Sequence, residues 1–164
     1  MRSPTCAATP FIAFVMFLAF CRLAAADDRE TCKNSSGDAA IAACENAIKS
    51  GKFKGKTLSI LYTNRGVEYV GKEDVDRAIA DHDQAIKLDP KNSLAFNNRG
   101  NAYSAKREFD RAIADYDQAI KLNPKYAAAF YNRGLTKEKK GDTEGGNADI
   151  AQARELQPGI GQPR

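Results

Sequence analysis

The sequence DRAIADHDQAIKLDP occupies residues 76–90, and it returns almost letter for letter as DRAIADYDQAIKLNP at 110–124. A shorter motif has the same offset, since YTNRG at 62–66 recurs as FNNRG at 96–100 and as FYNRG at 130–134. Two motifs that share one period do not arise by chance. The chain therefore contains a structural unit that occurs three times at a constant interval.

The apolar residues of the second copy follow the spacing of one face of an α-helix. This stripe consists of Phe109, Ala112, Ile113, Tyr116, Ala119 and Ile120. Pro124 ends the helix, because proline has no N–H to donate and its ring clashes with the preceding turn. The small residues Gly100 and Ala112 allow a second helix to approach closely. The pattern predicts pairs of amphipathic helices that must stack on their neighbours to bury their apolar faces.

A 34-residue period with an aromatic residue, then Gly, Tyr, Ala, Ala and a closing Pro resembles the tetratricopeptide repeat, a helix-turn-helix unit. The resemblance implies an all-α solenoid that winds into a right-handed superhelix. Counting from the recurring glycine gives repeats at 59–92, 93–126 and 127–160. The third repeat is degenerate, because Lys137 and Gly146 stand where the other repeats have Tyr and Ala.

Both ends of the repeat array differ from its centre. Residues 27–58 contain a helical segment at 39–48 and are expected to form an N-terminal helical cap on the first repeat. The last helix of the third repeat is more polar than its counterparts, with Arg154 in the place of Ile120, which suits a terminal helix that faces water. The sequence from Gly159 onward has no apolar period, and 161–164 is expected to be a loose tail.

Residues 1–26 have the pattern of a secretory signal peptide, with Arg2 before an apolar run at 11–20 and three alanines at 24–26. A membrane anchor is the alternative, but a run this short cannot cross a bilayer. Acylation of Cys21 is disfavoured by the bulky Phe20 before it. We expect cleavage near Asp27, no membrane insertion afterwards, and an exported protein of bacterial type in the periplasm or outside the cell.

Cleavage would leave Cys32 and Cys44 as the remaining cysteines. In an oxidising compartment the economical assignment is a disulfide between them, and two buried free thiols are the alternative. A metal site would need more Cys or His ligands, and a redox pair would need only two residues between its cysteines. We therefore expect no metal.

The charge and the motif content argue against several classes of function. The chain of 164 residues has 25 Lys and Arg against 21 Asp and Glu, and losing Arg2 and Arg22 leaves 23 basic residues. This balance favours neither nucleic acid nor an anionic membrane as a partner. The single histidine, His82, occupies the place of Tyr116, which indicates a core position. With no phosphate loop and no nucleophile with a base, we expect no enzyme and no cofactor.

The resemblance implies that the first helix of each repeat lines a concave groove that holds a peptide. At helical spacing, exposed Asn and Tyr side chains there can bond a peptide backbone from either side. The candidate partner-binding residues are Asn64, Asn97, Asn98, Asn101, Tyr131, Asn132 and Leu135. A solvated face without a ligand is the alternative.

A subfamily of similar proteins grips the terminal carboxylate of a chaperone tail with a clamp of Lys, Arg and Asn. Only Asn98 matches that clamp in this chain. Residues of other types stand at the remaining clamp positions, namely Thr63, Val67, Ala128 and Asn132. Binding of a chaperone tail in this manner is therefore disfavoured.

One charged pair recurs in every repeat, with an arginine in the first helix and an aspartate in the second. The pairs are Arg65 with Asp81, Arg99 with Asp115, and Arg133 with Asp149. We interpret them as scaffold contacts between helices, because a guanidinium presents a planar fork to a carboxylate; a ligand-binding role is the alternative.

The sequence thus predicts an exported scaffold that binds a protein or peptide in its groove. The alternative is a structural solenoid of the cell envelope that associates with itself, and a homo-oligomer stays open.

Overall fold

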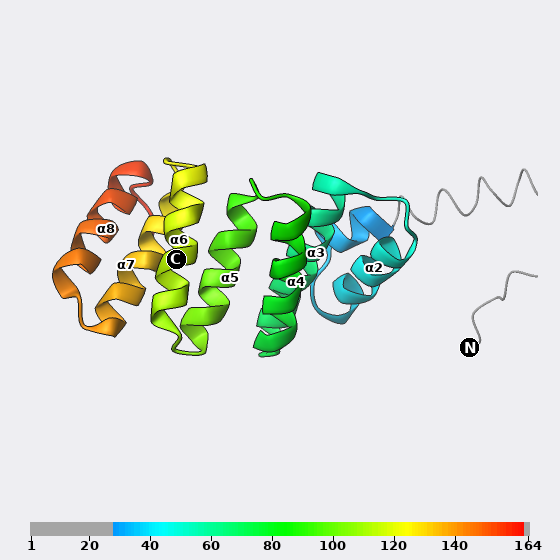
Figure 1. The fold of residues 1–164 in the computed structure, drawn as a ribbon, viewed down its shortest axis with the longest axis horizontal. Coiled ribbons are helices and arrows are strands. Elements are labelled where there is room, and N and C mark those ends of the chain that lie inside the picture. The colour runs from blue at the N-terminus through cyan, green and yellow to red at the C-terminus, as the bar shows by residue number, and fades with distance from the viewer. Residues whose placement is uncertain (1–27, 163–164) are drawn as a thin grey trace, which may run out of the picture.

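The computed structural model describes residues 28–162 of the chain (Figure 1). The segment 1–26, interpreted above as a signal peptide, lies outside the described residues. Residues 28–34 are helical and precede seven helices in a row. These are α2 (Gly37–Lys49), α3 (Gly55–Gly71), α4 (Val75–Leu88), α5 (Ser93–Ala105), α6 (Phe109–Leu122), α7 (Ala127–Lys140) and α8 (Thr143–Leu156). The described chain has no strand, so the all-α solenoid is confirmed.

The helices pair as α3 with α4, α5 with α6, and α7 with α8, and each pair stacks on the next (Figure 1). The first repeat begins with an additional helical turn, because α3 starts at Gly55 whereas the repeat frame starts at residue 59. In the next two repeats the prolines at 90 and 124 interrupt the chain just before the first helix. The loop that leads into α3 contains no proline, and the helix extends into the region assigned to the cap.

The turn inside each helical pair has one residue in the left-handed region, at equivalent positions of the three repeats. These residues are Glu73 (φ 61°), Arg107 (φ 63°) and Gly141 (φ 101°). The following amide N–H closes the end of the first helix in each case, as in the bond from Asp74 N to the Tyr69 carbonyl at 2.9 Å. Asp74 and Asp142 then cap the second helix of their pairs by accepting a backbone N–H from further along the chain.

A glycine in the first helix of each pair lets the second helix come close. A Cβ at Gly100 would lie 2.7 Å from Cε1 of Tyr116, and a Cβ at Gly66 would lie 2.6 Å from Cε1 of His82. Both rings are almost fully buried, with 1% of Tyr116 and none of His82 exposed. The predicted core position of His82 is confirmed, and the side chain fills the space that a tyrosine fills in the next repeat.

The three predicted Arg–Asp pairs form between the helices of each repeat. Arg65 donates from Nε and Nη2 to Asp81, both at 2.7 Å, and Arg99 and Arg133 hold Asp115 and Asp149 in the same two-pronged manner. Arg99 also donates to Asp83 of the preceding repeat at 2.6 Å. The scaffold interpretation is confirmed, and the second and third arginines additionally join neighbouring repeats.

The N-terminal cap is tied to the first repeat by covalent and polar contacts. A disulfide joins Cys32 to Cys44 with their Cα atoms 4.7 Å apart, and both residues belong to a buried cluster with Leu61 of α3. The backbone N–H of Gly37 at the start of α2 donates to the Glu68 carboxylate at 2.6 Å. The cap therefore shares its core with the first helix of the repeat array.

The C-terminal end of the array is polar. Ile79 of α4 packs against the core of the next repeat, whereas the equivalent position in α8 is the polar Asn147. After α8 the chain turns back toward α7, and a Cβ at Gly161 would lie 2.5 Å from the Tyr131 hydroxyl. Gly161, which is exposed, thus lies close to the Tyr131 ring of α7, at the start of the segment that the sequence analysis assigned to the tail.

Candidate functional site

The first helices of the three repeats, α3, α5 and α7, form one face of the solenoid. We call this surface the first-helix face. Its residues occupy equivalent repeat positions and are Ile60, Asn64 and Val67 on α3, Leu94, Asn98 and Asn101 on α5, and Ala128, Asn132 and Leu135 on α7.

The apolar part of this face lies on α3 and α5. Ile60 is 43% exposed, Val67 44% and Leu94 45%, and these are the large hydrophobic residues with exposed side chains in the part of the chain that the structure describes. Ile60 and Val67 are two helical turns apart on one side of α3, and Leu94 is the equivalent of Ile60 in the next repeat. Ile60 and Leu94 line the same pocket, which makes this part of the face a candidate contact surface for a ligand.

Next to the apolar patch, each helix contributes one half-buried carboxamide, from Asn64, Asn98 and Asn132. Asn132 donates from Nδ2 to the Asn97 oxygen at 3.2 Å, and Asn97 donates to the Asn98 oxygen at 3.1 Å. Within residues 28–162 this chain of bonds leaves the Asn98 N–H groups and the Asn132 oxygen without a side-chain partner. A donor and an acceptor side by side are what an extended peptide backbone requires.

The expectation that Asn97 is an exposed binding residue is wrong, since only 3% of it is exposed. Its position faces the next repeat rather than the first-helix face. The equivalent Thr63 is also buried, and its hydroxyl accepts a hydrogen bond from Asn92 at 3.2 Å. Asn97 can therefore position Asn98 and Asn132 but cannot itself meet a peptide.

Two other predicted residues are also engaged within the protein. The Asn101 oxygen accepts a hydrogen bond from the Tyr116 hydroxyl at 2.9 Å, and burial raises the pKa of Tyr116 to about 12, so that this hydroxyl stays protonated. Tyr131 is half-buried against the C-terminal turn at Gly161. Asn101 and Leu135 still line a cavity, whereas Tyr131 lies at the end of the array.

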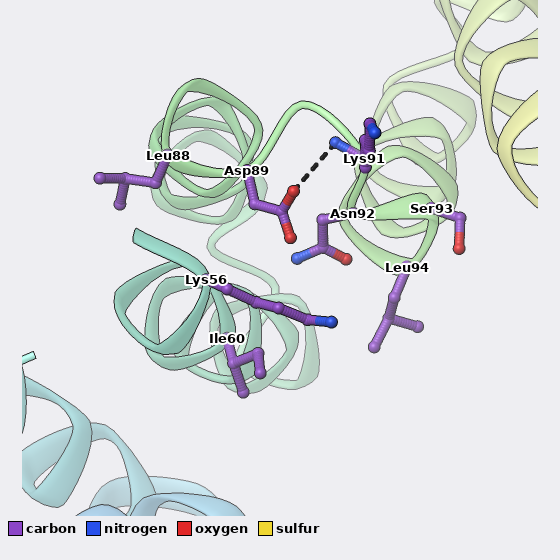
Figure 2. Close-up of a pocket in the computed structure, with 8 residues that line it drawn as sticks. All are labelled: Lys56, Ile60, Leu88, Asp89, Lys91, Asn92, Ser93 and Leu94. Carbon is purple, nitrogen blue, oxygen red and sulfur yellow. Dashed lines mark hydrogen bonds between the residues drawn. The ribbon is translucent and has the colours of Figure 1, made fainter. Parts of the chain in front are cut away.

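Two cavities open along this face. The N-terminal pocket, of about 530 Å³, lies where α3, the end of α4 and the start of α5 meet (Figure 2). Its lining residues are Lys56, Ile60, Leu88, Asp89, Lys91, Asn92, Ser93 and Leu94. The C-terminal pocket, of about 210 Å³, lies between α5 and α7 and includes Asn101, Asn132, Leu135 and Lys139.

Sequence reasoning missed the two lysines of the N-terminal pocket. Lys56 lies in the added first turn of α3, before the repeat frame begins, and Lys91 lies in the loop between repeats. Neither residue lies within the first helix of a repeat frame, so a search at helical spacing along those helices did not include them. The signal available in the sequence was a lysine shortly before the start of each repeat frame, at Lys56, Lys91 and Lys125.

The described residues offer no metal centre, because residues 28–162 contain no group of three or more His, Cys, Asp or Glu side chains that could hold an ion. In the same range, no helix has the length and apolar character needed to cross a membrane.

Three family models match the chain. They are described as a tetratricopeptide repeat at residues 93–126, a TPR repeat at 66–107 and a tetratricopeptide repeat at 115–146. No curated protein matches the chain. Together with the stacked helical pairs, the family models show that the chain belongs to the tetratricopeptide-repeat family.

Solved structures of this family are similar to the chain. The first TPR of Spaghetti (RPAP3) bound to HSP90 peptide SRMEEVD is 26% identical with a TM-score of 0.62, over 66% of this chain and 86% of that chain. The first TPR domain of the human RPAP3 protein is 27% identical with a TM-score of 0.62, over 63% of this chain and 82% of that one. The TPR protein YrrB shares the fold at 23% identity and a TM-score of 0.63, over 74% and 61%.

Proposed function

We propose that this protein is an exported scaffold that binds a peptide or helix of another protein on its first-helix face. The observation that carries the proposal is the exposure of Ile60, Val67 and Leu94 beside a row of carboxamides. The first TPR of Spaghetti, a structure similar to this chain, is bound to a peptide, which supports the same class of ligand here.

The energetics of the face favour a ligand. Covering the exposed part of each of the three apolar side chains contributes on the order of 1 kcal/mol, about half the value for burying a whole side chain. The amides of Asn98 and Asn132 add hydrogen bonds that orient the ligand without fixing its sequence. Apolar contacts supply most of the affinity, and the carboxamides determine the position of the peptide along the first-helix face.

The ligand is expected to be held differently from the HSP90 peptide bound by Spaghetti, without a clamp on its terminal carboxylate. The clamp positions that hold a terminal carboxylate in similar proteins carry Thr63, Val67, Ala128 and Asn132 here, and Thr63 is buried. None of these side chains has a positive charge to pair with the carboxylates of SRMEEVD. We therefore expect the terminal carboxylate of that peptide to add nothing to its affinity for this protein, unlike in a protein with the clamp.

A peptide selection tests the function. We expect residues 27–164 to enrich binders from a phage-displayed library of random dodecapeptides, and a selected peptide to bind roughly tenfold or more weakly to a Val67→Asp, Leu94→Asp variant, because a carboxylate replaces each apolar contact. Fluorescence anisotropy with labelled peptide measures the affinity, with SRMEEVD as a second probe.

The matched control carries Ala80→Asp and Ala114→Asp, which add the same charges at exposed positions of α4 and α6. This variant is expected to bind like the unmodified protein. Circular dichroism must show equal helicity for all three proteins. Equal loss of binding in both variants, or no loss in either, would place the ligand elsewhere on the solenoid.

Export makes a separate prediction. Protein recovered from cells that express the full chain with its N-terminal segment is expected to begin near Asp27 and to contain no free thiol, because the disulfide between Cys32 and Cys44 persists only in an oxidising compartment. N-terminal sequencing and thiol titration of the soluble envelope fraction measure both. Recovery of an uncleaved chain with reduced cysteines from the cytosol would contradict the export of this protein.

A further inference from the structure

The N-terminal pocket combines apolar walls with two positive charges. Ile60 and Leu94 supply the walls, and Figure 2 shows Lys56 extending from α3 toward the α5 side of the pocket while Leu88 points away. Lys91 reaches the pocket from the loop between α4 and α5. The volume of about 530 Å³ lies within the usual range for a ligand pocket.

The ammonium groups of Lys56 and Lys91 have no acidic partner among residues 28–162. Some other lysines in the same range are paired, such as Lys72 with Asp38 and Lys106 with Asp76. Asp89 is the acidic residue of the pocket lining, and its Oδ1 accepts the backbone N–H of Lys91 at 3.0 Å. Two ammonium groups against one carboxylate leave the pocket with a net positive charge.

The wall between the two lysines is fixed before any ligand arrives. Asn92 donates from Nδ2 to the Ser59 hydroxyl at 2.9 Å and to the Thr63 hydroxyl at 3.2 Å, and its oxygen accepts the Ala95 N–H at 3.1 Å. These bonds engage both ends of the Asn92 carboxamide and hold α5 against α3. A preformed wall reduces the entropy that binding must overcome.

We propose that this pocket binds an acidic-aliphatic segment of the partner protein. An aliphatic side chain of the partner lies between Ile60 and Leu94, and neighbouring carboxylates pair with Lys56 and Lys91. This inference rests on the proposed function and specifies the chemistry of the ligand at one end of the first-helix face.

Other anionic ligands fit the pocket less well. Binding of single-stranded nucleic acid relies on aromatic side chains that stack on bases, and the pocket lining has no aromatic residue. A free phosphate would leave the two aliphatic walls uncovered. A peptide with alternating apolar and acidic residues satisfies both the walls and the ammonium groups.

The amino-acid composition of the peptides enriched in the selection described above tests the inference. Peptides enriched by the unmodified protein are expected to contain Asp or Glu next to Leu, Ile, Val or Met. A Lys56→Glu, Lys91→Glu variant is expected to bind such a peptide roughly tenfold or more weakly, and raising the salt concentration should weaken the unmodified complex as well. Fluorescence anisotropy gives both affinities.

The matched control is Lys33→Glu with Lys121→Glu, which changes the net charge equally at two exposed lysines outside the pocket lining. It is expected to keep affinity within a factor of roughly two. Equal weakening by both variants would reduce the effect to overall charge and overturn the inference. All variants must keep the thermal unfolding midpoint of the unmodified protein to be compared.

The outcomes separate this inference from the proposed function. If no peptide is enriched, the proposed function fails and the inference fails with it. If peptides are enriched and respond to Val67→Asp, Leu94→Asp but lack acidic residues or ignore the change at Lys56 and Lys91, the binding face stands and only the acidic-aliphatic pocket is overturned.

Discussion

Replacing Arg99 by methionine is expected to lower the free energy of unfolding by about 2 kcal/mol, because the substitution leaves a buried carboxylate without its cation. The guanidinium donates to Asp115 at 2.8 and 2.7 Å and to Asp83 at 2.6 Å, so it joins α5 to both α6 and α4. These hydrogen bonds raise the pKa of Arg99 despite its partial burial, so the residue stays charged. Asp115, which is 6% exposed, would lose this cation in the variant.

The expected loss of stability is smaller than for a fully buried ion pair, because 20% of the Arg99 side chain is exposed and water can reach it. Urea unfolding followed by circular dichroism measures the change. An Arg99→Met, Asp115→Leu double variant should recover part of the loss, since no buried charge is then left unpaired.

The control is Arg77→Met, which removes an arginine that is 62% exposed and pairs with Asp74 within the same helix end. An exposed pair contributes little to stability, so the unfolding midpoint should hardly change. An equal loss in the two variants would show that the recurring arginines do not hold the repeats together.

Acidification is expected to destabilise the protein through His82. The side chain is fully buried, and neither ring nitrogen has a hydrogen-bond partner within residues 28–162. Burial is the main reason that the pKa of His82 falls from 6.5 to about 4; the nearby Arg99 charge acts in the same direction, and Asp83 opposes the shift. The folded protein therefore keeps this ring neutral in mildly acidic solution.

The direction of the effect follows from proton binding. Between pH 6.5 and about 4 the unfolded chain binds a proton at His82 that the folded chain does not, so stability falls as the pH falls. Above pH 6.5 both states are neutral at this residue and the contribution is constant. The lowered pKa of His82 corresponds to a decrease of about 3 kcal/mol in the free energy of unfolding between pH 6.5 and about 4.

A His82→Phe variant isolates the effect, because the chain has no other histidine. Phenylalanine fits, because the ring of the equivalent Tyr116 packs against Gly100 in the next repeat. Phenylalanine is preferred to tyrosine here, because Val67 offers no acceptor for a tyrosine hydroxyl. Urea unfolding at intervals from about pH 5 to 7, above the range in which carboxylates titrate, should show a nearly flat stability for the variant. An equally steep loss of stability in both proteins would assign the acid sensitivity to carboxylates instead.

The sequence predicted the helical pairs and several contacts between them. The sequence predicted a close approach of two helices at Gly100, where the structure places the ring of Tyr116, and the recurring Arg–Asp pairs formed as expected. These predictions succeeded because each depends on spacing within one repeat, which the helical period determines.

The candidate site could be predicted only in part. Asn64, Asn98 and Asn132 lie on the first-helix face, but Asn97, one residue before Asn98, is turned into the boundary between repeats. Successive residues on a helix point about 100° apart, so a difference of one position decides between solvent and interface. Whether a side chain at that boundary is covered depends on how the next repeat packs.

The sequence alone determined the repeat, its helices and the pairs within each repeat, because these contacts lie close along the chain and recur with one period. Only the tertiary structure decided where the binding surfaces lie. Lys56 precedes the first repeat frame and Lys91 belongs to a loop, yet stacking of α5 on α3 brings both to one pocket with Ile60 and Leu94. Local spacing cannot show contacts between repeats, because they depend on the distance and angle at which neighbouring helical pairs stack.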